Sequence, residues 1–268
     1  MKARFYKPKN NKLAEYIDGY YFMSEDESQP SDQYWSFPSN FCIATVIKNA
    51  KVINTGSCIS ILPAGDNKIA SDFYYNNSFP VKIDYQKPRN EVTIYFKPTA
   101  VIRFVPDLKF ESGKDTISDF SPYSDYLETM YQILSIEDRD KQIELFEKYW
   151  LSKLVPASLS VVQSILTDLE NNEKVSDIAG KLGISRQYLH KMFFKHIGKS
   201  PSEYQKTHRF KSVVDEYKTQ KKLTELSYNN QFFDQAHFNK HFKELTGVSP
   251  TSFFKNVDIT DSNFWLFV

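Results

Sequence analysis

The sequence predicts an α+β chain in two parts, a β-rich N-terminal domain and an all-helical C-terminal domain. Short runs rich in Ile, Val, Phe and Tyr lie between turn signals over residues 33–105 and are typical of strands. From residue 120 the apolar residues recur at helical spacings instead. A helical module ending in Gly-x-Ser-Pro occurs twice, at 175–201 and 223–250. At 268 residues the chain is long enough for two domains of ordinary size.

Composition favours a folded protein that is neither secreted nor membrane-spanning. Hydrophobic residues make up 41% of the chain, and no run approaches the roughly eighteen apolar residues of a membrane span. The start, MKARFYKPKNNKL, lacks the apolar segment of a secretory signal. Cys42 and Cys58 lie in apolar runs typical of strands, which favours reduced core thiols over a disulfide. A cytoplasmic location is therefore expected.

Charge is unevenly divided although the whole chain carries only +1. Residues 1–154 contain 19 Lys and Arg against 21 Asp and Glu, a net charge of −2. Residues 155–256 contain 15 against 10, a net charge of +5. A basic helical half is what phosphate binding requires. Because +5 is modest, we expect affinity to depend on base contacts as well.

The first half of the chain supplies the strands. Residues 12–21 have an apolar pattern suited to a short helix or to a strand that leads into a sheet. Several short strands at this spacing indicate a sandwich or a small barrel. The predicted strand runs are Phe41–Ile47, Lys51–Asn54, Ile59–Leu62, Ser78–Tyr85 and Glu91–Phe96.

Aromatic residues of the β-rich domain are mostly expected in its core, although they could also line an effector site. Arg103 or Lys82 could hold an anionic effector. The aromatic residues in question are Trp35, Phe37, Tyr74, Tyr75, Tyr85 and Tyr95.

Residues 120–155 predict two helices next to the strands. Their apolar stripes either cover the β-rich domain or serve as a dimerisation surface, and both interpretations stay open. The first stripe is Tyr126, Leu127, Met130, Ile133 and Leu134, and the second is Ile143, Phe146, Trp150 and Leu154.

Pro156 marks the expected domain boundary, because proline disfavours a helical conformation in the residue before it. We therefore divide the chain into residues 1–155 and residues 156–268. A helix follows, capped by Ser158 or Ser160 and running through Leu169. Its inward residues are expected to be Val161, Val162, Ile165 and Leu166.

The first copy of the module reads as a helix, a tight turn and a second helix. Gly183 suits the turn, Ser185 is a typical N-cap, and Gly198 is a typical helix end. The residues expected on the inner faces are Val175, Ile178, Ala179, Leu182, Leu189, Met192, Phe193 and Ile197.

The second copy repeats this order about fifty residues later, with Asp234 as the N-cap and Gly247 as the helix end. Its inner faces are expected from Leu223, Leu226, Phe232, Phe238, Phe242 and Leu245. The chain thus contains an internal repeat of a helix-turn-helix.

The repeat resembles the tandem helix-turn-helix domain of AraC-type bacterial transcription regulators. The second copy carries F-x-D-Q-A-H-F-x-K-x-F-K-x-x-T-G-V-S-P from Phe232 to Pro250. The first carries I-A-x-x-L-G-I-S-x-x-Y-L-x-x-x-F from Ile178 to Phe193. A connecting helix opens with residues 204–209. The resemblance covers about a hundred residues and involves both copies.

One position departs from the family pattern. Gln231 stands where the family usually has glycine. If the turn needs a positive φ there, glutamine costs roughly 1 kcal/mol relative to glycine. Otherwise the turn moves to Asn229 or Asn230, since asparagine tolerates the left-handed region.

The resemblance implies a sequence-specific transcription regulator that binds double-stranded promoter DNA and associates with the nucleoid when bound. It also implies a cupin-like jelly roll for the β-rich domain and dimerisation through the helical pair. RNA polymerase, a small-molecule effector and a second copy of the chain are the other candidate partners. No cofactor and no metal are expected.

The residues expected to contact DNA project away from the inner face of the second helix in each copy. Gln187 suits an adenine edge and Lys191 the acceptors of guanine, whereas Lys195 and Lys243 suit phosphates. A solvated surface is the simpler interpretation of any single Lys or Gln, but the same placement in both copies favours DNA. The predicted contacts are Arg186, Gln187, His190, Lys191, Lys195, Gln235, His237, Asn239 and Lys240.

Two other classes of function stay open. The helical domain could have lost DNA affinity, leaving a ligand-binding or protein-binding module. An enzyme is disfavoured, because all five histidines lie at or after residue 190 and none in the β-rich domain. His237 and His241 are spaced i, i+4 but lack the glutamate of the metalloprotease motif.

The chain ends in an apolar tail, Asn263–Val268. Exposed apolar segments favour association. We expect this tail either to fold back on the protein or to dock on a partner subunit.

Overall fold

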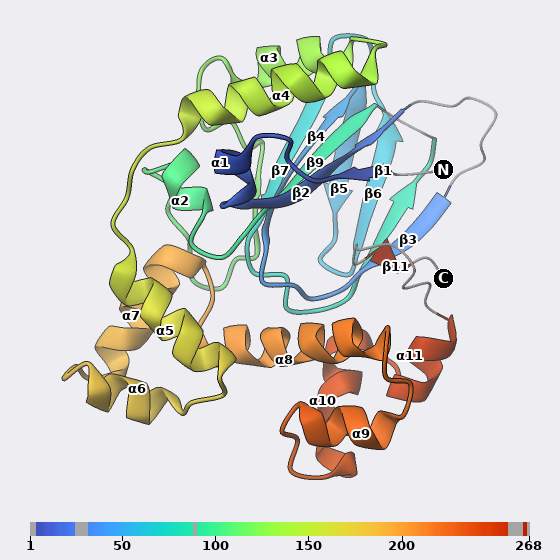
Figure 1. The fold of residues 1–268 in the computed structure, drawn as a ribbon. Helices are drawn as coiled ribbons and strands as arrows, with labels where there is room; N and C mark the ends of the chain where they lie inside the picture. The colour runs from blue at the N-terminus through green and yellow to red at the C-terminus, as the bar shows by residue number, and fades with distance from the viewer. Residues whose placement is uncertain (1–3, 25–31, 88–89, 257–264, 267–268) are drawn as a thin grey trace.

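The computed structural model describes residues 4–24, 32–87, 90–256 and 265–266. A β-rich domain (residues 4–153) carries two helices over one sheet, and a helical region (residues 160–256) lies against its other end (Figure 1). The predicted α+β class is confirmed. Within the described residues, no helix combines the length and the apolar character that a membrane crossing demands.

Two sheets form the β-rich domain. All recorded strand pairs are antiparallel except β6 with β8, which is parallel. The first sheet runs in the order β1 (Arg4–Tyr6), β2 (Ile17–Met23), β9 (Glu91–Phe96), β4 (Cys42–Lys48), β7 (Ile69–Tyr74) and β10 (Thr116–Ser118). The second runs β11 (Trp265–Leu266), β3 (Asp32–Ser36), β8 (Val81–Tyr85), β6 (Cys58–Pro63) and β5 (Ala50–Asn54).

The central strands of the first sheet are buried on both faces. Along β2, Tyr20 and Phe22 pack towards α3 (Tyr126–Leu134) and α4 (Arg139–Lys153), whereas Tyr21 packs between the sheets. The predicted stripes of both helices lie in this core, and Trp150 is fully buried. Their inner faces therefore cover the β-rich domain, as one of the two interpretations expects. Dimerisation stays a prediction for their outer faces.

The strand predictions need correction at β7 and β8, and residues 12–21 combine the two alternatives expected for them. Strand β7 is missed, because Ser71 and Asp72 interrupt the apolar pattern although both are buried. The run from Ser78 shortens to Val81–Tyr85, since Pro80 has no amide to donate to a ladder. The segment 12–21 holds both α1 (Asn11–Ala14) and the start of β2.

The remaining elements are helices, and their predictions need correction at one cap and at two expected inner-face residues. The helix after Pro156 has Leu159 as its N-cap with no side-chain cap bond, so neither Ser158 nor Ser160 caps it. Val161 is 48% exposed and Leu182 36% exposed, so neither belongs to an inner face. The helices are α2 (Val101–Phe104), α5 (Ser160–Glu170), α6 (Val175–Lys181), α7 (Arg186–Ile197), α8 (Pro201–Tyr217), α9 (Leu223–Asn229), α10 (Gln235–Thr246) and α11 (Pro250–Asn256).

The helical region has two cores joined by α8. The first contains residues of α5, α6 and α7, together with Tyr204 from the first turn of α8. The second contains residues of α9, α10 and α11, together with Phe210 and Val213 from later turns of α8. Because one continuous helix contributes to both cores, it connects the two copies of the module.

The apolar tail returns to the β-rich domain. Its described pair, Trp265 and Leu266, forms β11 and pairs antiparallel with Ser36 and Trp35 of β3. The other residues of the predicted tail, 263–264 and 267–268, lie outside the described residues.

Candidate nucleic-acid interface

Each copy of the module builds its second helix from local signals. In the first unit (residues 175–197), the Ser185 hydroxyl accepts the Tyr188 amide at 3.2 Å at the start of α7. In the second unit (residues 223–246), the Asp234 carboxylate accepts the His237 amide at 2.6 Å at the start of α10. Both helices end in a left-handed glycine. The predicted caps and ends are therefore confirmed.

The inner faces of α7 and α10 match the predicted stripes. Leu189 and Phe193 in α7, like Phe238 and Phe242 in α10, are at most 1% exposed. These residues fix the rotation of each helix about its axis. Because the inner side is filled by apolar side chains, the opposite side is left for solvent or a ligand.

The predicted contact residues differ in their exposure. Half-buried residues are His190 in α7 and Gln235 in α10. The exposed residues are Arg186, Gln187, Lys191 and Lys195 in α7, and His237, Asn239, Lys240 and Lys243 in α10. Both helices thus present cationic and amide side chains on the side away from their cores. Contact with DNA stays a prediction for each of these residues.

The second helices of the two units, α7 and α10, each pack against α8. The Tyr204 ring packs on Phe193 of α7 at 5.6 Å between centroids. The Phe210 ring packs on Phe242 of α10 at 5.2 Å. An ion pair between Lys206 of α8 and Glu244 of α10, at 2.6 Å, lies on the same connection.

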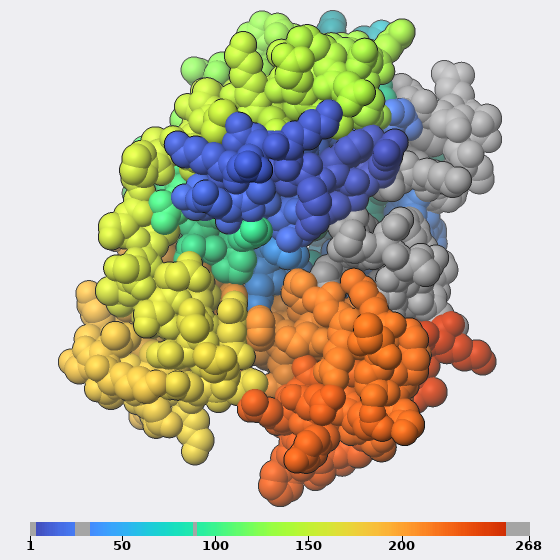
Figure 2. Space-filling view, viewed as in Figure 1, coloured from blue at the N-terminus to red at the C-terminus, as the bar shows by residue number. Residues whose placement is uncertain are grey.

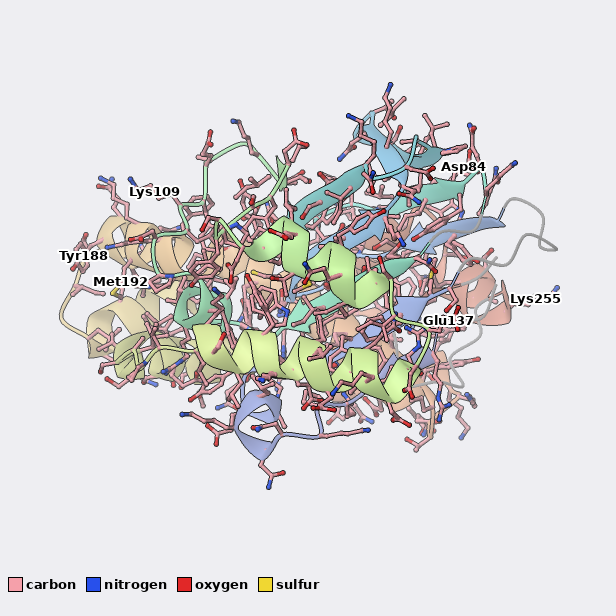
Figure 3. All side chains as sticks on the ribbon, turned by 90° about the horizontal axis from the view of Figure 1, so that it is seen from above. Asp84, Lys109, Glu137, Tyr188, Met192 and Lys255 are labelled. Carbon is pink, nitrogen blue, oxygen red and sulfur yellow. The ribbon has the colours of Figure 1, made fainter. Side chains whose placement is uncertain are left out.

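The figures place the two units side by side. They form separate lobes at the lower end of the molecule (Figure 2). Seen from above, Tyr188 of α7 lies at one end of the molecule and Lys255 of α11 at the other (Figure 3).

Sequence reasoning missed one exposed aromatic residue in the first unit and two in the second, where Tyr228 of α9 is 84% exposed. Tyr188 on α7 is 58% exposed, and Phe233, just before α10, is 92% exposed. The second turn is one residue longer than the first, since two residues separate Gln231 from its N-cap position and one separates Gly183 from its own. Phe233 is the additional residue, which explains why it has no place in the core. Counting the residues between turn and cap would have found it.

Gln231 keeps the turn at the position of the family glycine. Its φ is +57°, and neither Asn229 nor Asn230 has a positive φ. The strained alternative of the two predictions is the correct one.

One histidine of α10 belongs to the core rather than to the interface. His241 is 7% exposed, and neither ring nitrogen has a hydrogen-bond partner among the described residues. Burial lowers the pKa of His241 to about 3, and the nearby Arg209 and Lys206 act in the same direction. The neutral ring therefore adds no charge to α10.

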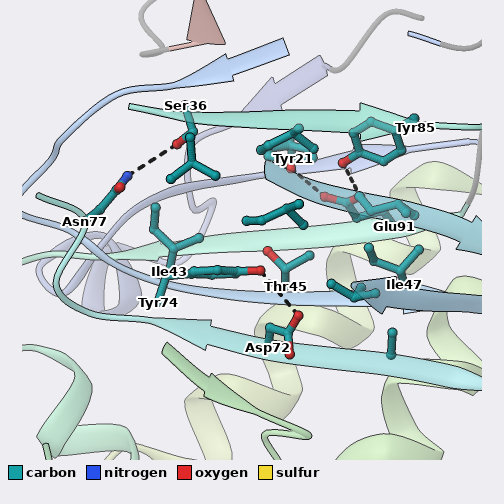
Figure 4. Close-up of a pocket in the computed structure, with 16 residues that line it drawn as sticks. Tyr21, Ser36, Ile43, Thr45, Ile47, Asp72, Tyr74, Asn77, Tyr85 and Glu91 are labelled. Atoms are coloured by element: carbon teal, nitrogen blue, oxygen red, sulfur yellow. Dashed lines mark hydrogen bonds between the residues drawn. The ribbon is translucent and has the colours of Figure 1, made fainter. Parts of the chain in front are cut away.

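A small cavity of about 60 Å³ lies between the two sheets (Figure 4). Apolar residues such as Ile43 and Ile61 line most of it. The Glu91 carboxylate at one end accepts the hydroxyls of Tyr21 and Tyr85, each at 2.5 Å. Burial raises the pKa of Glu91, and the hydroxyl bonds oppose that shift. Neither Arg103 nor Lys82 is among its described lining residues, so neither is placed to hold an anion in this cavity.

Residues 178–256 match the helix-turn-helix domain family. Over 99 residues the chain is 29% identical to the uncharacterized HTH-type transcriptional regulator YidL of Escherichia coli, covering 37% of this chain and 33% of that protein. Over 121 residues it is 33% identical to the Msm operon regulatory protein of Streptococcus mutans, covering 42% of this chain and 44% of that protein. The chain thus spans less than half the length of these two relatives.

Among solved structures, the fold is similar to ToxT from Vibrio cholerae. The likeness covers 88% of this chain and 96% of that chain, with a TM-score of 0.47 and 16% sequence identity. A ToxT structure with a bound unsaturated fatty acid gives the same TM-score at 15% identity, over 86% of this chain and 92% of that chain.

Proposed function

We propose, from the premise that residues 178–256 form a helix-turn-helix domain of the AraC type, that the chain is a sequence-specific DNA-binding transcription regulator. One observation carries the proposal. Two capped helices of equal length, α7 and α10, bury their apolar faces and expose Lys191 and Lys240 at the same helix position. This is the arrangement that major-groove reading requires.

The proposed mechanism is binding rather than catalysis. The two recognition helices enter successive major-groove segments about 34 Å apart on one face of the duplex. Gln187 and Gln235 read base edges, where an amide can bond an adenine bidentately. Lys195 and Lys243 neutralise phosphates and release counterions. In this scheme the double-stranded promoter is the partner, and the bound protein is associated with the nucleoid.

The β-rich domain, which we propose extends to residue 155, is assigned a regulatory role. The cavity between its sheets supports this role, because it is apolar with two acidic side chains, Glu91 and Asp72, at its wall. An effector there would act by changing the relative stability of domain arrangements. RNA polymerase and a second copy of the chain are further proposed partners.

The test is selection of DNA by the purified full-length protein from a pool of random duplexes. We expect a single enriched motif with two segments, whose affinity falls steeply as salt rises. A Lys191→Ala, Lys240→Ala double variant should lose the enrichment, whereas Lys51→Ala, an exposed lysine of β5, should keep it. Failure of the unaltered protein to enrich any sequence would instead favour a helical region that serves only protein contacts.

A further inference from the structure

One loop of the β-rich domain contacts residues from both cores of the helical region. It comprises residues 37–41 and connects β3 to β4. Phe37, Ser39 and Asn40 are between 5% and 7% exposed, although they belong to a connection between strands. Loops normally run over the surface. The burial of this one comes from the helical region, as its contacts show.

The first end of the loop reaches the second unit. Phe37 belongs to the apolar core of that unit, and its ring meets Phe253 edge-on at 5.1 Å between centroids. Phe253 in turn meets Phe242 of α10 at 5.0 Å. A single aromatic residue therefore separates the loop from the inner face of the second recognition helix.

The other end of the loop reaches the first unit. The Asn40 amide donates to the Tyr204 carbonyl at 3.1 Å, and the Tyr204 ring packs on Phe193 of α7. The buried ammonium of Lys199, which follows the C-cap Gly198 of α7, donates to the Ser39 carbonyl. Here too a single residue separates the loop from the inner face of a recognition helix.

The loop is also fixed to its own domain. The Asn77 amide donates to the Phe37 carbonyl at 3.1 Å and to the Ser36 hydroxyl at 3.3 Å. Ser36 and Ile43, which flank the loop, both line the cavity between the sheets. The loop is thus held by the β-rich domain beside the cavity between its sheets.

We propose that residues 37–41 form a clamp that sets the separation of the two recognition helices, and hence the spacing between the two DNA segments that they read. Helix α8 is the covalent connection between the units, but it is one straight element with a unit at each end. The clamp provides a second connection. With both connections the relative position of the two units is fixed, whereas α8 alone would let it change whenever the helix bends. Phe37 and Asn40 are positioning residues, since they act through Phe253 and Tyr204 rather than on DNA.

The inference rests on the proposed function, and its test measures spacing tolerance. With a site selected by the full-length protein, one base pair is inserted between its two segments. We expect the insertion to weaken binding of the unaltered protein by about tenfold or more, because it rotates one segment away from its helix. In Phe37→Ala the same insertion should cost only about twofold, while affinity for the original site falls about tenfold. Asn40→Ala should show the same change to a smaller extent, because it removes fewer packed atoms than Phe37→Ala.

Phe79→Ala serves as the matched control, since Phe79 of the same domain is 66% exposed. It should keep the full insertion penalty. An unchanged penalty in both Phe37→Ala and Asn40→Ala would overturn the clamp while leaving DNA binding intact.

A second measurement works without DNA. Spin labels are attached after Lys195→Cys and Lys243→Cys substitution in a Cys58→Ser background, with Cys42 left buried. We expect one narrow distance in the otherwise unaltered protein and a broad distribution in Phe37→Ala. Equally narrow distances in both would overturn the clamp. Because this readout needs no DNA, it separates failure of the clamp from failure of the proposed function.

Discussion

Gly183 and Gln231 occupy the same position in the two turns, with φ values of +65° and +57°. The Gly183 amide donates to the Gly180 carbonyl at 3.1 Å, and the Gln231 amide donates to the Tyr228 carbonyl at 3.0 Å. The two turns therefore share one backbone geometry although their residue types differ. Glycine adopts a left-handed conformation readily, whereas the same conformation is sterically strained for a residue with a Cβ.

Gln231→Gly should therefore stabilise the protein. We expect a gain of about 0.5–1 kcal/mol, since relief of the left-handed strain outweighs the greater freedom of glycine in the unfolded chain. Urea unfolding followed by helical circular dichroism measures the change. Gln163→Gly is the matched control, because Gln163 is exposed within α5 and its replacement should instead cost about 1 kcal/mol. A loss of stability in Gln231→Gly would contradict the strained turn.

Gln235→Ala tests direct reading of a base. Gln235 is the first residue of α10 and lies half-buried beside its N-cap. We expect a loss of about 1–3 kcal/mol on the selected site and relaxed preference at one base pair. Affinities for the site and for its single-base variants give both quantities. Equal weakening on random DNA would mean that Gln235 only positions the domain.

Lys195→Gln and Lys243→Gln test contacts with phosphates. Both side chains are exposed, near the ends of α7 and α10. Each substitution should weaken binding to all sequences about equally and lower the slope of log affinity against log salt by about one. Titrations between about 50 mM and 200 mM salt measure the slope. A substitution that changes sequence preference but not the slope would assign that lysine to a base instead.

His241→Phe should remove part of the acid sensitivity of the second unit. The folded state keeps the ring neutral, with a pKa of about 3, whereas the unfolded chain protonates it near the ordinary value of 6.5. The contribution of the neutral His241 ring to the free energy of unfolding is therefore fully present above about pH 6.5, and it is lost as the pH falls towards 3. The contribution lost between pH 7 and pH 5 is about 2 kcal/mol.

The measurement compares urea unfolding of the two proteins at pH 7 and pH 5. The variant should lose less stability over this interval, and Phe232, whose ring lies 5.2 Å from His241, offers an apolar neighbour for the new ring. His237→Phe is the control, since His237 is exposed on the same helix. Parallel losses in His241→Phe and the unaltered protein would show that His241 takes up its proton without unfolding.

The helices and their ends could be predicted because their signals are local. Ser185 and Gly198, for example, act within a few residues of their own positions. The exposure of Leu182 could not be predicted, because it depends on which neighbours surround the end of a short helix. Burial of Lys199 was equally hidden, since its partner Ser39 lies 160 residues earlier in the chain. The outward side of α7 and α10 was predictable from periodicity, because the spacing of the apolar residues fixes the inner face of each helix.

The two glycines that end the recognition helices provide the last prediction. Gly198 and Gly247 both have φ of +77°, so alanine at either position would be strained by about 1–2 kcal/mol. Their surroundings differ. A Cβ on Gly198 would lie 2.8 Å from the Tyr75 ring and 2.9 Å from the Phe110 ring of the β-rich domain, whereas a Cβ on Gly247 would meet nothing within 4 Å.

Gly198→Ala should therefore destabilise the protein by about 1–3 kcal/mol more than Gly247→Ala, because two rings of the other domain must move. Urea unfolding of both variants measures the difference, with the strain itself cancelling between them. Gly198→Ala should also loosen the contact between the domains, which faster proteolysis at residues 154–159 would report. Equal destabilisation by the two substitutions would mean that the β-rich domain moves away from the first unit at little cost, and α7 would then be held by the helical region alone.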